Sequence, residues 1–171
     1  MVTAEEGDGP LPIMKPLGHA ARKDEAERPV HAPGDLYLKD IVIVGWDQAG
    51  NYTDNAPVRL AADNVTAVLK NVVFDFNRQQ FVRINAVGCK LYIEDCTFGN
   101  AGVSQRFQQG MAISFRGNWT PIVHLRNNTF YNSHNEILNN QGTKRYQKLI
   151  MENNTIMNTG QGGCDFGRPD A

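Results

Sequence analysis

An eight-residue pattern that recurs five times constrains the fold of this chain more than any other feature. The pattern runs apolar, any, apolar, charged, Asn or Asp, any, any, apolar, and successive copies start 24 to 32 residues apart. The copies span 36–43, 67–74, 91–98, 123–130 and 149–156. Self-similarity at such periods indicates that one small structural unit is stacked repeatedly. We therefore expect a repeat architecture.

The pattern predicts two short strands that meet at a sharp corner. Apolar residues at positions one and three point to one side of a strand, and those at positions six and eight do the same on a second strand. The Asn or Asp at position five tolerates the left-handed backbone angles that a corner requires. The predicted corner residues are Asp40, Asn71, Asp95, Asn127 and Asn153.

A third predicted strand follows each copy and completes one turn of the chain. Its inward residues are, in order, Val58 and Leu60, Val82 and Ile84, Ile113 and Phe115, Leu138 and Asn140, and Cys164 and Phe166. Three short strands per turn are typical of a parallel β-helix, an all-β solenoid whose coils stack about 4.8 Å apart. We expect about five coils. The alternative is an antiparallel β-sandwich, which also contains many short strands.

Stacked coils predict columns of equivalent side chains. One inward column is apolar and holds Ile43, Phe74, Phe98, Phe130 and Ile156. A second changes from apolar residues to amides and holds Ile41, Val72, Cys96, Asn128 and Asn154. Stacked amides can hydrogen-bond along the column, which offsets the cost of burying them.

The chain divides by composition at residue 35. Residues 1–35 contain five of the eight prolines and a charge balance of −3, whereas residues 36–171 have a balance of +2. We interpret 1–35 as an irregular leader or the remnant of a preceding coil, and 36–171 as the β-helix domain. The net charge of −1 argues against nucleic acid as a partner. No apolar run of about 18 residues predicts a membrane span.

Three cysteines, Cys89, Cys96 and Cys164, occur at spacings that fit no zinc site. We expect buried free thiols, because free cysteine packs as a small apolar residue. A disulfide between Cys89 and Cys96 is the alternative. The first residues lack the layout of a signal peptide. Either the protein is cytoplasmic, or the chain is a piece of a longer secreted protein.

The segments Arg126–Phe130 and Glu152–Ile156 resemble the coils of right-handed parallel β-helix proteins of the pectate-lyase-like superfamily. The resemblance covers about residues 36–166. It implies a secreted or cell-surface protein that binds or cleaves polysaccharides. Because catalytic domains of this superfamily usually have more than five coils, it also implies a fragment of a longer protein.

Two long connections, 45–57 and 99–111, leave the same corner of the first and third coils, and the connection 75–81 between them is short. Such walls beside a low floor would form a groove for a sugar chain. Trp46 and Tyr52 on the walls are candidate stacking residues for sugar rings. The alternative is that these loops are variable insertions without a ligand.

The outward side of the third strand would form the floor of the groove. By register it carries Arg59, Arg83, Ser114, Asn139 and Asp165, with Asn85, Arg116 and Gln141 one step further. Three arginines on one strip fit recognition of carboxylates or sulfates. The resemblance implies a lyase in which Arg83 removes a proton while Arg59 and Arg116 hold the uronate carboxylate. Asn85 and Asn139 are further candidate substrate ligands. The alternative is a solvated outer face.

The segment 132–144 loosely resembles the active-site coil of the alginate and chondroitin lyases of polysaccharide lyase family six. That resemblance implies a metal ligand at Glu136 and a base at Lys144, although the Lys lies further from the Glu than in that family and a second acidic ligand is absent. Oxygen-rich loops suit calcium, and Asp75 is a candidate ligand for it.

Taken together, these features predict a secreted or surface β-helix that binds an acidic polysaccharide and, as a lyase, cleaves it by β-elimination. The alternative is a non-catalytic β-helix module with a structural or adhesive role.

Overall fold

The computed structural model describes residues 2–3, 13–14, 30–32, 34–45, 56–77, 79–102, 110–116, 121–141, 146–160 and 164. Within these residues the protein is all-β and contains no helix. Among the described residues there is no helix of sufficient length and apolar character to span a bilayer.

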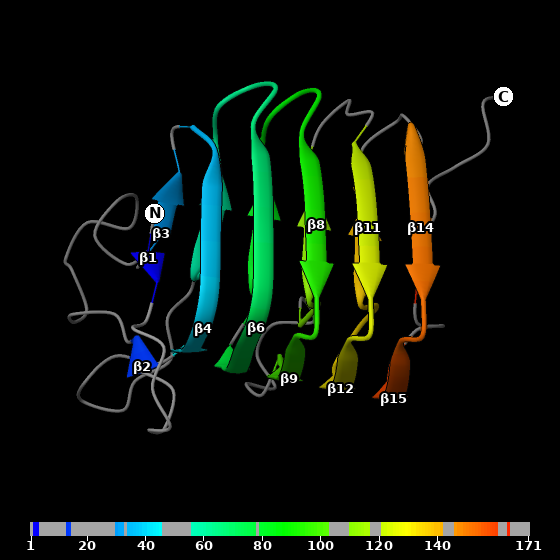
Figure 1. The fold of residues 1–171 in the computed structure, drawn as a ribbon. Helices are drawn as coiled ribbons and strands as arrows, with labels where there is room; N and C mark the ends of the chain where they lie inside the picture. The colour runs from blue at the N-terminus through cyan, green and yellow to red at the C-terminus, as the bar shows by residue number, and fades with distance from the viewer. Residues whose placement is uncertain are drawn as a thin grey trace, which may run out of the picture.

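The described residues form fifteen strands (Figure 1). They are β1 (Val2–Thr3), β2 (Ile13–Met14), β3 (Val30–Ala32), β4 (Leu36–Val44), β5 (Val58–Leu60), β6 (Thr66–Asn77), β7 (Val82–Ile84), β8 (Lys90–Glu94), β9 (Thr97–Ala101), β10 (Ile113–Phe115), β11 (Ile122–Arg126), β12 (Thr129–Ser133), β13 (Leu138–Asn140), β14 (Lys148–Glu152) and β15 (Thr155–Thr159).

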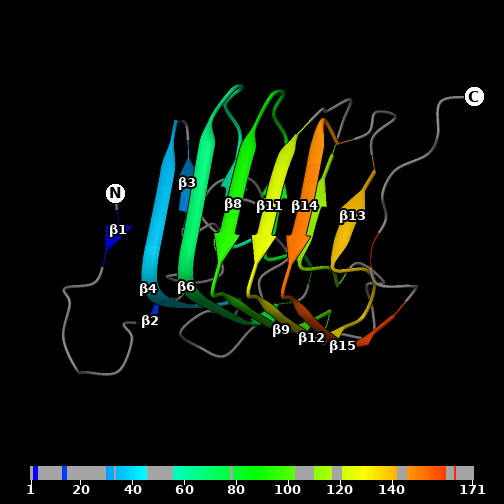
Figure 2. The ribbon, with the colours of Figure 1, turned by 45° about the vertical axis from the view of Figure 1, so that its right-hand side comes forward.

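The strands form two sheets. The larger has the order β14-β11-β8-β6-β9-β12-β15, with β4 beside β6 and both β1 and β2 on β4. The smaller has the order β13-β10-β7-β5-β3 and lies behind the front strands of Figure 1. Figure 2 shows that the larger sheet is curled, because β9, β12 and β15 run at a steep angle to β8, β11 and β14.

Every strand pairing among the described residues is parallel. The predicted copies lie side by side in the expected register, with Leu38 opposite Leu69 and Leu125 opposite Ile93. This arrangement is compatible with a β-helix or another solenoid. The alternative of an antiparallel sandwich is wrong, because its neighbouring strands would run in opposite directions.

The predicted corner residues bend the larger sheet. Their φ angles are all positive, at 54° for Asp40, 50° for Asn71, 56° for Asp95, 55° for Asn127 and 52° for Asn153. Asn and Asp adopt this left-handed region more readily than other residues with a Cβ. Side-chain hydrogen bonds join successive corners, with Asn71 Nδ2 donating to Asp40 Oδ1 over 2.7 Å and Asn127 Nδ2 to Asp95 Oδ1 over 3.2 Å.

Phenylalanines fill the middle of the core. The ring of Phe98 stacks between those of Phe74 and Phe130, with centroids 4.7 and 5.0 Å away and planes inclined by 12°. All three side chains are buried. Ile156 continues the column in register with Phe130 but is 40% exposed, because no described strand lies beyond β15.

The neighbouring column changes from apolar to amide as expected. Asn128 is 1% exposed, and its Oδ1 accepts the backbone N–H of Cys96 over 2.9 Å. Its Nδ2 donates to the carbonyl oxygen of Ile93 and to Oδ1 of Asn154, both over 3.0 Å. These bonds satisfy a buried amide that would otherwise cost about 1–3 kcal/mol per unpaired group.

Short strands from residues 1–35 extend both sheets. Strands β1 and β2 pair in parallel with β4, and β3 pairs in parallel with β5. All three cysteines are free thiols, so the disulfide alternative is wrong. Cys89 and Cys96 are buried as expected, whereas Cys164 is partly exposed. The backbone of Cys164 forms an isolated parallel β-bridge with Leu138.

Candidate functional site

The outer face of the smaller sheet aligns the candidate residues that the register predicted. Arg59 on β5 lies opposite Arg83 on β7, Arg83 lies opposite Ser114 on β10, and Ser114 lies opposite Asn139 on β13. Adjacent strands in a sheet are about 4.8 Å apart, so these side chains form one column across the sheet. We call Arg59, Arg83, Ser114, Asn139 and the flanking Asn85 and Arg116 the arginine strip.

Asn85 and Arg116 follow the ends of their strands in continued register. Their backbone N–H groups donate to the carbonyl oxygens of Leu60 and Ile84 respectively, each over 3.0 Å. Asn85 also orients the central arginine, because its Oδ1 accepts a hydrogen bond from Arg83 Nε over 2.9 Å. This bond directs the Arg83 side chain toward Asn85, two residues further along the chain, and Asn85 is a neutral partner.

Most residues of the strip are partly exposed. They are Arg59, Arg83, Asn85, Arg116 and Asn139. Burial lowers the pKa of the Arg116 guanidinium from its usual value, but an arginine in a protein still keeps its proton at neutral pH. The strip thus presents three cationic side chains.

The strip differs from the predicted open floor at its centre. Ser114 is 0% exposed, and its Oγ has no hydrogen-bond partner. The Nε of Arg59 and the Oδ1 of Asn139 are likewise buried without a partner. Unsatisfied polar atoms in one column carry a desolvation cost of about 1–3 kcal/mol each, which new hydrogen bonds would relieve.

The two acidic residues predicted as metal ligands lie in different surroundings. Glu136 is beside the strip, where its Oε2 accepts a hydrogen bond from Asn139 Nδ2 over 3.3 Å. Asp75 lies on β6 in the larger sheet, and its Oδ1 accepts hydrogen bonds from Asn100 Nδ2 and from the N–H of Phe76, over 2.7 and 3.0 Å. Within the described ranges no three His, Cys, Asp or Glu side chains gather as metal ligands would.

Asp75 instead has a tyrosine for a neighbour. Burial, together with the carboxylate of Asp75, raises the pKa of the Tyr131 phenol. The Tyr131 ring reaches across Gly99, where a Cβ would overlap its Cζ and hydroxyl atoms. Asp75 therefore has structural contacts: it accepts hydrogen bonds at a corner of the larger sheet and lies near Tyr131.

Four predicted site residues lie outside the described residues. These are the candidate base Lys144, the candidate stacking residues Trp46 and Tyr52, and the floor residue Asp165. Most of each predicted wall, 46–55 and 103–109, also lies outside them.

Sequence reasoning missed a second ladder of asparagines. Asn100, Asn132 and Asn158 have φ angles of 57°, 52° and 50°, and each donates from Nδ2 to an oxygen of the coil before it. They border a shallow polar depression of about 360 Å³. A signal was present, because each asparagine lies two residues after an inward residue of the phenylalanine column.

No protein-family model, no curated protein and no solved structure matches this chain.

Proposed function

We propose that this protein is a secreted or cell-surface right-handed parallel β-helix of about five coils, of the pectate-lyase-like type, that binds an acidic polysaccharide along the arginine strip. The observation that carries the proposal is the register of Arg59 and Arg83 on adjacent strands, with Arg116 one step further on the next strand. Guanidinium groups bind carboxylates and sulfates through paired, charge-assisted hydrogen bonds.

The repeat of the strip suits a polymer with a charge on successive units. A strand spacing of about 4.8 Å sets the interval between neighbouring side chains, so several acidic groups of one extended chain can be held at once. Rotation of the partly exposed Arg59 side chain toward such a ligand would also supply a partner for its buried, unpaired Nε.

Cleavage by β-elimination is the finer part of the proposal. In that reaction a base removes the proton beside the uronate carboxylate, the electron pair forms a carbon–carbon double bond, and the glycosidic oxygen leaves with the electrons of its bond to carbon. Arg83 at the centre of the strip is the proposed base, and Arg59 and Arg116 would neutralise the developing charge. A guanidinium must lose its own proton before it can accept another, so this reaction requires Arg83 in its deprotonated form and alkaline solution. Calcium is proposed as an additional neutralising ion, for which Glu136 is the ligand nearest the strip.

The test measures binding and cleavage on the same full chain. Mobility in gels that contain polygalacturonate, alginate or chondroitin sulfate, with neutral starch as the blank, reports binding. We expect Arg83→Gln to weaken binding to the preferred polyanion by about tenfold or more, since each lost charge-assisted hydrogen bond contributes about 1.5–3 kcal/mol. Ultraviolet absorbance of the unsaturated product, with calcium and with a chelator, reports cleavage.

A matched variant separates the strip from general charge attraction. Arg126 lies on β11 in the other sheet, its side chain is 61% exposed, and Arg126→Gln removes the same charge. Equal weakening by both variants, or none by Arg83→Gln, would refute the strip as the binding site. Binding without product under any condition would support the non-catalytic module and refute the lyase.

A further inference from the structure

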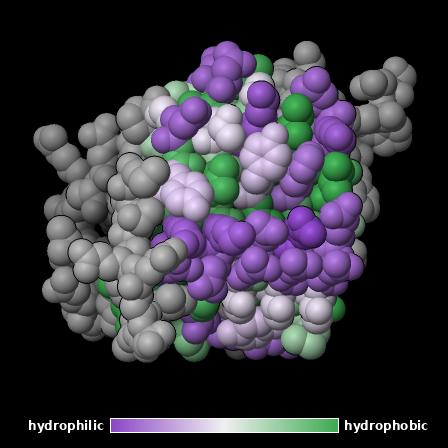
Figure 3. Space-filling model, viewed as in Figure 1, coloured by the Kyte–Doolittle hydropathy of each residue, from purple (hydrophilic) through white to green (hydrophobic). Residues whose placement is uncertain are grey.

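A column of aromatic and apolar side chains covers the outer face of the larger sheet. Tyr37 on β4, Val68 on β6, Tyr92 on β8, His124 on β11 and Ile150 on β14 lie opposite one another in register. All five are partly exposed. We call them the tyrosine face. In Figure 3 a largely white and green belt crosses the front strands above a continuous purple band.

Charged residues lie two positions further along the same strands, at Lys70, Glu94 and Arg126. Lys70 pairs with Glu94 over 3.2 Å, and Arg126 lies 3.7 Å from the other oxygen of the same carboxylate. Two cations thus share one carboxylate in these contacts. The tyrosine face itself contains no Lys, Arg, Asp or Glu, which suits an uncharged ligand.

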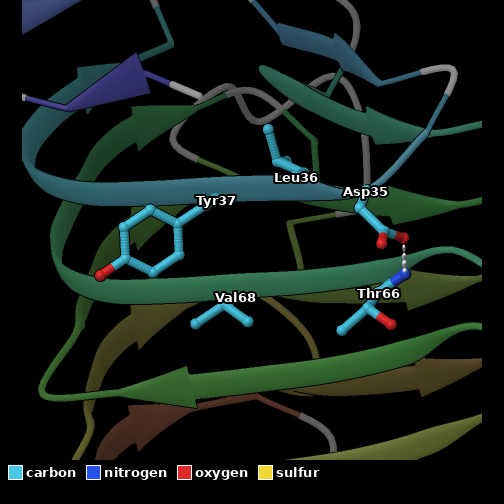
Figure 4. Close-up of a pocket in the computed structure, with 5 residues that line it drawn as sticks. All are labelled: Asp35, Leu36, Tyr37, Thr66 and Val68. Carbon is cyan, nitrogen blue, oxygen red and sulfur yellow. Dashed lines mark hydrogen bonds between the residues drawn. The ribbon is translucent and has the colours of Figure 1, made fainter.

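A pocket of about 310 Å³ opens at the β4 end of the tyrosine face. It is lined by Asp35, Leu36, Tyr37, Thr66 and Val68. Figure 4 shows the Tyr37 ring on one side and the Asp35 carboxylate with Thr66 on the other. Asp35 Oδ1 accepts the backbone N–H of Thr66 over 2.7 Å, which fixes the carboxylate at the rim.

We propose that this pocket and the tyrosine face bind a neutral saccharide chain. A sugar ring has a face of C–H bonds and a rim of hydroxyl groups, which match an aromatic ring and a polar rim respectively. A carboxylate offers about four acceptor positions, so Asp35 retains acceptors for sugar hydroxyls after bonding Thr66. Its negative charge disfavours uronates, which distinguishes this pocket from the arginine strip.

The spacing along the column extends the contact beyond one sugar. Tyr37 and Tyr92 are two strands apart, about 9.6 Å, and the short side chain of Val68 lies between them. Tyr92 is held in place by His124, whose ring packs edge-on with a centroid distance of 4.9 Å and an angle of 68°. Two aromatic rings with a gap between them suit alternate residues of an extended sugar chain that runs along the stack of strands.

The experiment uses the full chain and three neutral probes, the hexamers of xylose, glucose and mannose in β-1,4 linkage, with hexagalacturonate as the acidic comparison. Isothermal titration calorimetry measures affinity. We expect at least one neutral hexamer to bind, Tyr37→Leu to weaken it by about tenfold, and Tyr37→Phe, which keeps the ring, to change it by less than about threefold. Met157→Ala leaves this binding unchanged, because Met157 is 50% exposed on β15, which carries no residue of the tyrosine face or the arginine strip.

Several results would overturn the proposal. These are no binding of any neutral hexamer, equal affinity in wild type and Tyr37→Leu, or equal loss in Met157→Ala. Self-association that Tyr37→Leu abolishes, without saccharide binding, would assign the face to a protein partner instead. Tyr92→Leu is the second variant if Tyr37→Leu does not fold, and thermal unfolding followed by circular dichroism checks each protein. Because this site does not depend on the arginine strip, either proposal can fail alone.

Discussion

At the scale of single residues, Cys96 shows how one side chain can join two kinds of column. It lies between apolar Val72 and the amide of Asn128, and it is 1% exposed. Its Sγ accepts the N–H of Val72 over 3.4 Å and lies 3.2 Å from the carbonyl oxygen of Glu94. Burial raises the pKa of the Cys96 thiol to about 12, so the folded protein keeps this proton in mildly alkaline solution.

This shift predicts a specific loss of stability at high pH. The unfolded thiol loses its proton from about pH 8.5, whereas the folded thiol keeps it to about pH 12, so the unfolded state binds fewer protons and the free energy of unfolding falls as pH rises between these values. Cys96 contributes up to about 1.4 kcal/mol per pH unit to that fall. Urea unfolding from pH 8 to 11 should show a shallower decline for Cys96→Val. Identical declines in both proteins would contradict the prediction.

At the scale of elements, close backbone contacts fix where strands begin and end. Gly102 and Gly110 meet at the two described ends of the connection after β9, and a Cβ on Gly110 would overlap the Cα of Gly102 and lie 2.5 Å from the carbonyl oxygen of Ala101. The Gly110 carbonyl oxygen also accepts hydrogen bonds from Ser133 Oγ and the N–H of Asn135, both over 2.8 Å. This backbone has no room to move away from a new methyl group.

Gly110→Ala should therefore destabilise the protein by about 1–3 kcal/mol, the usual cost of overpacking. Gly34→Ala is the matched control, because a Cβ there meets nothing within 4 Å, and it should change stability by less than about 0.5 kcal/mol. Chemical denaturation of both variants measures the difference. Equal stabilities would show that the connection yields and does not constrain the strand ends.

The sequence predicted the first corner of each coil and missed the second for a physical reason. Position five always holds Asn or Asp, because a left-handed angle is needed in every copy. At the second corner Phe76 takes the left-handed angle in β6, with φ of 51°, and Gly45 occupies the matching place after β4. Only the last three copies carry asparagine there, so the pattern is incomplete along the chain.

The candidate site, too, could be predicted only in part, because strand register follows from the repeat whereas burial does not. Strand register depends on the repeat itself, and it placed Arg59 and Arg83 on adjacent strands. The burial of Ser114 depends on what packs over the strand, which no local pattern encodes. Tyr37 and Tyr92 both stand at position two of the repeat, so the register aligned them too. The pocket beside Tyr37 depends on how Asp35 and Thr66 lie in space, which the repeat does not encode.

At the scale of the whole molecule, stability should depend on position along the stack. In repeat architectures each unit contacts only its neighbours, so the free energy of unfolding is close to a sum over units and their interfaces. Phe98 touches aromatic rings on both sides, whereas Ile156 in the same column has a described neighbour on one side only. Interior and terminal members of one column therefore contribute unequally.

Truncation along this column tests the idea directly. Phe98→Ala removes a buried ring from the middle and should cost about 3–5 kcal/mol in the global free energy of unfolding. Ile156→Ala removes a side chain that is 40% exposed and should cost less than about 1 kcal/mol globally. Native-state hydrogen exchange should show that its effect is confined to β14 and β15, because local opening at the end of a stack need not disturb the rest. If Ile156→Ala lowers protection uniformly from β4 to β15, the strands unfold as one cooperative body and the additive description of the stack is wrong.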